Sequence, residues 1–335
     1  MPSLELASID DFLGPRDSRF LGEGFKRVER SLNDLTVSPG DEGVGGIQAT
    51  ARIAIPGLWS RKGEQSPQPH LSTIDAMLFG AQLTGLYAAH TLGLTPDARF
   101  TVQRVDLKAG ARPDEDHLEA VPVSGRLVAA QRAGEEWATT LDCRIGSLTA
   151  RVHARHSPGR TLARTDRVYA GARELAGPWN HTPYGISHHA RRQLLTGVRV
   201  STDDQDDLRA TARVTLARDP AHAVPPDAPA TMIDAFVAAL QLGQVLLYTL
   251  DGIDRAHSNN LWMRRTRVTA GPALPRPADE VSAALEQTML LPSPVGTWRT
   301  AEVVGSLHGV QARAGVGHLL PQPSLSAASP GRSGR

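Results

Sequence analysis

Two carboxylates occupy matching positions in two apolar segments of this sequence. Asp75 and Gln82 are the strongly polar side chains early in segment 72–90, and Asp234 and Gln241 repeat their spacing in segment 231–250. Seven residues turn an α-helix through about 700°, so each pair lies on one stripe of its helix. A buried carboxylate must be paired, hydrated or close to neutral. Asp75 and Asp234 are therefore candidates for acid–base catalysis, and Gln82 and Gln241 for substrate binding.

The same two aspartates have a purely structural interpretation. Ser72 and Asp75 fit the Ser/Thr-x-x-Asp/Glu pattern that caps a helix N-terminus, and Thr231 and Asp234 fit it again. In that role each carboxylate only accepts a backbone N–H and favours the helix dipole. Occurrence in both segments supports this reading, because a structural role is needed twice and one active site only once. Both interpretations remain open at the level of sequence.

His70 stands just before the first apolar segment, within Pro67–Ser72. The matching stretch of the second segment, 225–229, contains no histidine. This asymmetry suggests that one groove rather than two carries out catalysis. We expect His70 of one unit to face Asp234 of the other and to move a proton at neutral pH, as a third catalytic candidate beside the aspartates. The alternative is that His70 only occupies a turn.

Three further side chains are candidates for substrate binding. Trp59 lies on a predicted loop between a strand and a helix, where it could cover a ligand. Arg264 and Arg265 lie on a predicted strand and could hold a phosphate or a carboxylate, although ordinary surface charge also explains them. No metal site is predicted, because no metal-ligand spacing is present and Cys143 is the only cysteine.

Composition limits the possible partners. The 335 residues contain 36 Lys and Arg against 35 Asp and Glu, a net charge of +1 that gives no footprint for nucleic acid or an anionic membrane. The apolar stretches 74–94 and 232–250 each carry an aspartate and a glutamine, which favours buried helices over membrane spans. No signal peptide is recognisable at the N-terminus, so we expect a cytoplasmic protein.

The sequence is an internal duplication. ATAR at Ala49–Arg52 recurs at Ala210–Arg213, 161 residues later, and IDA at Ile74–Ala76 recurs at Ile233–Ala235, 159 residues later. Further short matches follow in the same order at offsets that differ by a few residues. Two units of this length indicate a fused pseudo-dimer. The expected units are 15–157 and 181–320, with a linker at 158–180 and a disordered tail at 321–335.

Each unit has the same order of predicted elements. An alternating strand (47–55 and 208–216) precedes the apolar helix, and three strand-like runs follow it (100–109, 118–131 and 137–153; 261–270, 281–291 and 298–315). Each helix is apolar nearly all round, so the sheet must wrap it. The predicted fold is α+β, a tandem double hotdog in which two antiparallel sheets each enclose a long central helix.

Two segments resemble the avirulence D protein (AvrD) family. They are GEGFK at Gly22–Lys26 and PHLSTIDA at Pro69–Ala76, and length and duplicated layout agree with the family over residues 15–320. The resemblance implies a role in making syringolide-type or butenolide-like metabolites. It implies an acyltransferase that joins a β-ketoacyl thioester to a sugar such as xylulose. No cofactor is implied beyond the acyl carrier, which is coenzyme A or the phosphopantetheine of an acyl carrier protein, itself a possible partner.

Two other functions remain open. A hotdog β-hydroxyacyl dehydratase or a thioesterase would keep the fold and change the reaction. The dehydratase signature needs Gly four residues after the histidine, and Ile74 stands there. The other alternative is a non-catalytic protein that binds an acyl ligand.

Overall fold

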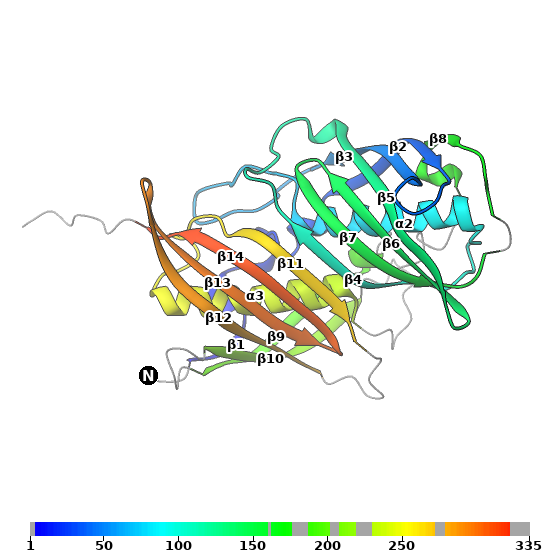
Figure 1. Ribbon diagram of the computed structural model, residues 1–335. Helices are drawn as coiled ribbons and strands as arrows, with labels where there is room; N and C mark the ends of the chain where they lie inside the picture. Colours follow the sequence, from blue (N-terminus) through cyan, green and yellow to red (C-terminus); the bar gives the residue numbers. More distant parts are fainter. Residues whose placement is uncertain are drawn as a thin grey trace, which may run out of the picture.

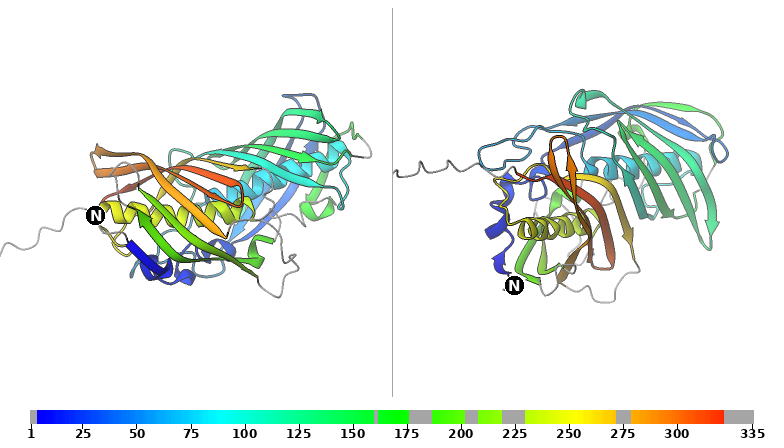
Figure 2. Two further views of the ribbon diagram at one scale, coloured as in Figure 1. Left: turned by 90° about the horizontal axis from the view of Figure 1, so that it is seen from below. Right: turned by 60° about the vertical axis from the view of Figure 1, so that its left-hand side comes forward.

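One continuous antiparallel sheet runs through the whole molecule and curves around two long helices (Figure 1). The computed structural model describes residues 4–159, 162–175, 187–201, 208–218, 230–271 and 279–321. Within these ranges the sheet has 14 strands, in the order β1-β9-β10-β12-β13-β14-β11-β4-β7-β6-β5-β3-β2-β8. Figure 2 shows both helices lying within the curve of this sheet.

The two units repeat one arrangement of elements, except that the first has an additional last strand at 167–171. The first consists of β2 (Glu29–Ser38), β3 (Gly46–Ala54), α2 (Thr73–Leu92), β4 (Phe100–Lys108), β5 (Val121–Ala133), β6 (Glu136–Ile145), β7 (Leu148–His156) and β8 (Arg167–Gly171). The second consists of β9 (Arg191–Ser201), β10 (Arg209–Arg218), α3 (Met232–Asp251), β11 (Trp262–Ala270), β12 (Glu280–Ser293), β13 (Gly296–Leu307) and β14 (Val310–Leu319). Before them come β1 (Leu4–Ser8), α1 (Asp10–Leu13) and the short helices Arg16–Ser18 and Gly24–Lys26.

Both central helices are delimited by local sequence signals. Ser72 and Thr231 are N-caps that complete capping boxes with Asp75 and Asp234. Gly93 and Gly252 follow the last turns at φ of 64° and 61°, the left-handed conformation that glycine adopts without a Cβ clash. α3 is long and apolar enough to span a membrane, but 83% of that apolar window is buried inside the protein. It is therefore the core helix around which β9–β14 wrap.

The units join where β4 meets β11. These strands pair antiparallel from Arg104 opposite Thr269 to Lys108 opposite Arg265, so the two sheets become one. Each unit thus encloses one helix in a curved antiparallel sheet, and the units share a single sheet. This architecture confirms the predicted α+β tandem double hotdog.

Several details were not anticipated from sequence. The runs predicted as 137–153 and 298–315 are each two strands, because tight turns at Gly146–Ser147 and His308–Gly309 reverse the chain. The first strands of the units, β2 and β9, were also missed. β1 pairs with β9 and so extends the sheet of the second unit, whereas β8, within the predicted linker, pairs with β2 of the first. Most of the tail predicted to be disordered, residues 322–335, lies outside the described residues.

Candidate functional site

Asp75 is fully engaged at the N-terminus of α2. Its Oδ2 accepts the N–H and the hydroxyl of Ser72, both at 2.7 Å. Its Oδ1 accepts Nε of Arg30, on β2, at 2.6 Å. The Arg30 and Asp75 side chains are only 5% and 2% exposed. The carboxylate is therefore a helix cap and one half of a buried ion pair.

Asp234 is held in the same manner at the N-terminus of α3. Its Oδ2 accepts Thr231 N–H at 2.8 Å and Nη1 of Arg191, at the start of β9, at 2.9 Å. Its Oδ1 accepts Nε2 of Gln193 at 2.7 Å. This geometry favours the capping interpretation for both aspartates. Their catalytic role stays a prediction.

His70 lies where the loop 55–72 of the first unit contacts the second unit, a contact that we call the seam. Its ring stands between two tryptophans. Its ring centroid is 4.7 Å from that of Trp59 of the same unit and 5.6 Å from that of Trp262, the first residue of β11 in the second unit. Its Nδ1 lies 3.1 Å from the carbonyl oxygen of Gln68. A carbonyl only accepts, so Nδ1 carries the proton and Nε2 offers a lone pair when the ring is neutral. Within the described part of the chain, no hydrogen bond or ion pair joins His70 to Asp234.

The loop that carries Trp59 and His70 is fastened to the second unit by buried cations. Lys62 Nζ donates to Asn259 O at 2.5 Å and to Ser258 Oγ at 3.2 Å. Arg255 Nη2 donates to Ser60 Oγ at 3.3 Å. Lys62 and Arg255 are each 8% exposed. These contacts join residues of the two units that are almost 200 positions apart in the chain.

The substrate-binding candidate Gln241 is engaged by the N-terminal segment of the chain. Its Oε1 accepts Nη1 of Arg19 at 2.9 Å, and Arg19, which is 3% exposed, also forms an ion pair with Asp10. Gln82, its counterpart on α2, is half-buried. Gln241 therefore ties the N-terminal segment of the chain to α3.

Burial and repulsion between neighbouring cations lower the pKa values of Lys62 and Arg19. Desolvation, the larger cause, and the nearby charge of Arg255 together lower the pKa of Lys62 to about 7. Desolvation likewise lowers the pKa of Arg19 to about 10, against the opposing effect of Asp10. An appreciable fraction of Lys62 is therefore uncharged near neutral pH, unlike an ordinary surface lysine.

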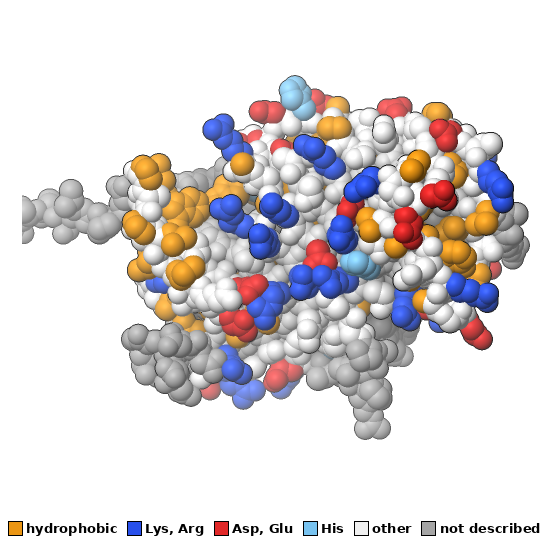
Figure 3. All heavy atoms as spheres, in the orientation of Figure 1, with side chains coloured by type: hydrophobic (Ala, Val, Ile, Leu, Met, Phe, Trp, Pro, Cys, Tyr) orange, Lys and Arg blue, Asp and Glu red, His pale blue; other side chains and the backbone are white. Residues whose placement is uncertain are grey.

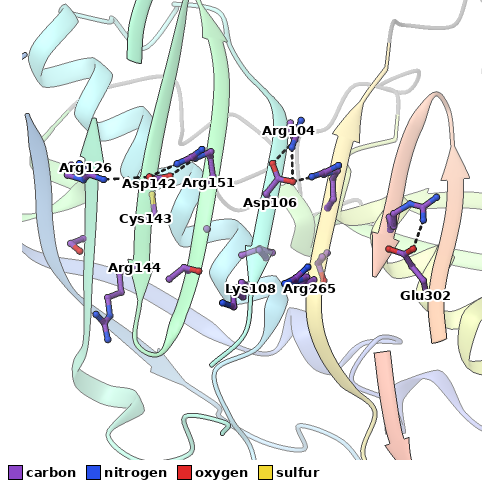
Figure 4. Close-up of a pocket in the computed structure, with 17 residues that line it drawn as sticks. Arg104, Asp106, Lys108, Arg126, Asp142, Cys143, Arg144, Arg151, Arg265 and Glu302 are labelled. Carbon is purple, nitrogen blue, oxygen red and sulfur yellow. Dashed lines mark hydrogen bonds and ion pairs between the residues drawn. The ribbon is translucent and has the colours of Figure 1, made fainter. Parts of the chain in front are cut away.

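Arg265 lies elsewhere, on the outer face of the sheet. It lines a basin of about 900 Å³ that spans the β4–β11 junction. The charged side chains of this basin are eight cations and three carboxylates. Figure 3 shows blue side chains gathered over the middle of this face, and Figure 4 shows Arg265 beside Lys108 within the basin. Arg264 is exposed on the same strand.

Some residues of the seam belong to no motif that could be recognised in the sequence. Arg255, Ser258 and Tyr248, whose hydroxyl accepts Ser258 Oγ at 3.1 Å, were not singled out. Arg30 and Arg191 could have been found, because they are 161 residues apart, the offset of the strand repeat. These two arginines neutralise the capping aspartates of α2 and α3.

The fold and the seam together define a double hotdog protein. The chain belongs to the family described as Pseudomonas avirulence D protein (AvrD), whose model matches residues 4–321. This confirms the resemblance drawn from its sequence motifs. A search of curated proteins finds no match.

Solved structures resemble the chain only distantly. A TesB protein of Mycobacterium avium subspecies paratuberculosis is 11% identical, with 85% of this chain and 96% of that chain covered at a TM-score of 0.39. A protein titled oleoyl thioesterase from Lactobacillus plantarum is 12% identical, with 76% and 91% covered at 0.39. An acyl-CoA thioesterase II from Mycobacterium marinum is 11% identical, with 88% and 97% covered at 0.34.

Proposed function

We propose that this protein is an acyltransferase that joins a β-ketoacyl thioester to a sugar such as xylulose, in the biosynthesis of syringolide-type or butenolide-like metabolites. Membership of the AvrD family supports this general role. The observation that carries the chemistry is His70, held between Trp59 and Trp262 at the seam of the two hotdog units. A base at this place, beside the N-terminus of α2, suits attack on a carbonyl.

The proposed reaction begins with proton removal by His70. Because Gln68 holds Nδ1–H, Nε2 is the basic nitrogen, and it takes the proton of a sugar hydroxyl. The hydroxyl oxygen bonds to the thioester carbonyl carbon, and the carbonyl electrons move to oxygen. When they return, the C–S bond breaks, and the thiolate takes the proton from His70. The products are an acyl sugar and a free thiol, so atoms and charge balance.

The N-terminus of α2 offers stabilisation for the oxyanion. The first-turn amides of Thr73 and Ile74 have no acceptor four residues back in the helix, and this end of the helix dipole is positive. The amide of Asp75 is already bonded to Ser72 Oγ at 3.2 Å. Asp75 itself is neutralised by Arg30, so its charge opposes an oxyanion less than a lone carboxylate would.

The aromatic pair is suited to exclude water and to hold the acyl chain. Trp59 is 8% exposed and packs on Phe20, with ring centroids 4.6 Å apart, so its position is fixed from both sides. Trp262 comes from the other unit. A substrate beside His70 would therefore contact both units.

Thiol release measured by mass spectrometry tests the proposal. The protein is incubated with a β-ketoacyl thioester, with and without xylulose. We expect release of the thiol and formation of an acyl sugar only when xylulose is present. Release that needs no sugar would support a thioesterase instead. Water loss from a β-hydroxyacyl thioester would support a dehydratase, and no change of any thioester would favour a non-catalytic binding protein.

A further inference from the structure

Two neighbouring rows of side chains cross the outer face of the sheet and differ sharply in charge. In the first row, every residue is the direct cross-strand partner of the next, and positive and negative charges alternate. We call it the paired row; its members are Arg267, Asp106, Arg151, Asp142 and Arg126. Arg267 and Arg151 lie 2.5 and 2.6 Å from their carboxylates. Opposite charges facing each other in this way stabilise a sheet.

The second row lies two residues further along the same strands, towards the end of the sheet at α2's N-terminus. Its members, again in direct cross-strand register, are Arg265, Lys108, Thr149, Arg144 and Ser124. We call it the cationic row. None of its cations forms an ion pair with a carboxylate among the described residues. The next carboxylate on this side, Glu302, lies two strands beyond Arg265 and is bound to Arg313.

This contrast is not expected from sheet stability alone. Arg265 directly faces Lys108, and like charges at such positions destabilise a sheet. The paired row shows that the same five strands accommodate alternating charge one pleat away. Figure 4 shows Lys108 and Arg265 side by side with no dashed line to any carboxylate, whereas Arg126, Asp142 and Arg151 are linked. An anionic ligand would remove the repulsion in the cationic row.

The cationic row adjoins the segment that carries His70. The turn after Arg144 lies against Leu71. The contact is close enough that a Cβ added at Gly146 would lie 3.0 Å from Leu71 Cδ2. Asp114 bridges the same turn to this segment: its Oδ2 accepts Ser147 N–H at 2.7 Å and its carbonyl accepts Leu71 N–H at 2.9 Å. At the other end of the row, Arg265 is three residues from Trp262, which contacts His70.

We propose that the cationic row binds the phosphate groups of an acyl-coenzyme A, the thioester donor of the proposed reaction, on which this inference rests. Neighbouring strands are about 4.8 Å apart, so the cations extend over roughly 14 Å from β11 to β6. Coenzyme A carries a diphosphate and a separate 3′-phosphate, which suit cations spread over such a distance. Thr149 and Ser124 add hydroxyl donors. The pantetheine arm then passes around the sheet end towards His70.

Binding measurements on two matched double variants test this assignment. The test variant, Lys108→Gln with Arg265→Gln, removes two charges from the cationic row. The control variant, Arg267→Gln with Arg151→Gln, removes two charges from the paired row and leaves Asp106 with Arg104 and Asp142 with Arg126. Titration calorimetry with coenzyme A, dephospho-coenzyme A and pantetheine gives the dissociation constants.

We expect the test variant to bind coenzyme A about tenfold or more weakly and the control variant to change by less than about threefold, because the arginines of the paired row are already bound to carboxylates. Pantetheine binding should be equal in all three proteins. Equal affinity of the wild type for coenzyme A and pantetheine would overturn the proposal, and so would equal losses in the two variants.

A phosphate-free substrate separates this proposal from the proposed function. An N-acetylcysteamine β-ketoacyl thioester should be converted at the same rate by wild type and test variant. If neither the wild type nor the variants release thiol from this or any other thioester, the proposed acyltransferase function is wrong. The calorimetry with coenzyme A still tests whether the cationic row binds phosphate. If the test variant loses turnover with an acyl carrier protein thioester but keeps its affinity for coenzyme A, the row is a carrier-protein surface and the coenzyme A proposal is overturned.

Discussion

Arg30 donates to Asp75 at 2.6 Å, from the first strand of a unit to the cap of the helix which that strand covers. Asp75→Asn would leave the guanidinium, 5% exposed, without its counter-ion. We expect a loss of about 3–5 kcal/mol in the free energy of unfolding, measured by denaturant titration.

The surface pair Arg151 and Asp142 provides the control for this prediction. These side chains are 50% and 31% exposed, so Asp142→Asn should cost less than about 1 kcal/mol. If Asp75→Asn keeps wild-type stability but abolishes turnover, the catalytic interpretation of Asp75 is correct and the structural one is wrong.

His70→Ala should strongly slow acyl transfer without unfolding the protein. His70 is half-buried, and its hydrogen bond is to the exposed loop residue Gln68, so stability should change by less than about 1 kcal/mol. Loss of a general base lowers kcat by about 10²–10⁴-fold. Steady-state rates of thiol release and thermal melting measure the two effects. His257→Ala is the control, because His257 is 79% exposed and interacts with Asp254 on the surface. An equal fall in rate in both variants would contradict the assignment.

Lys62 should make stability increase with pH. Its pKa is about 7 in the folded protein and near 10.5 in the unfolded chain, so the unfolded state binds more protons between these values. The free energy of unfolding therefore rises as pH rises through this window, and the cost of charging Lys62 is fully present below pH 7. Lys62→Met removes this dependence.

Denaturant titrations of wild type and Lys62→Met at pH 7 and pH 9 measure the difference. Relative to the variant, the wild type should gain about 2 kcal/mol between these pH values, and other titrating groups largely cancel in the comparison. A constant difference across this range would show that Lys62 is not buried beside Arg255.

Cys143 should report on unfolding. It is 3% exposed on β6, and burial raises the pKa of its thiol to about 12. A buried, protonated thiol reacts slowly, because the thiolate is the nucleophile. We expect a thiol reagent to modify the native protein only as fast as the sheet around Cys143 opens by local or global unfolding. In denaturant the modification should be quick. Fast, stoichiometric labelling of the native protein would contradict the buried position of β6.

The sequence by itself determined that this protein has two units, each with a long central helix wrapped by a sheet. Local signals repeated at one offset sufficed: the alternating strand at 47–55, the capping motifs at Ser72 and Thr231, and helices apolar on every side that only a wrapping sheet can bury. These features depend on neighbouring residues, and the second copy verified each of them. Two short segments, 22–26 and 69–76, likewise sufficed to indicate the AvrD family.

The tertiary structure alone decided which side chains meet. Trp262 beside His70, Lys62 on Ser258 and Arg19 on Gln241 join residues separated by about 190 positions or more, and no periodicity encodes such contacts. The cationic row exists only because β4 pairs with β11 in one register; a shift of one residue would turn Arg265 away from Lys108. Helices and caps follow from local chemistry, whereas the site follows from how two copies of one unit pair.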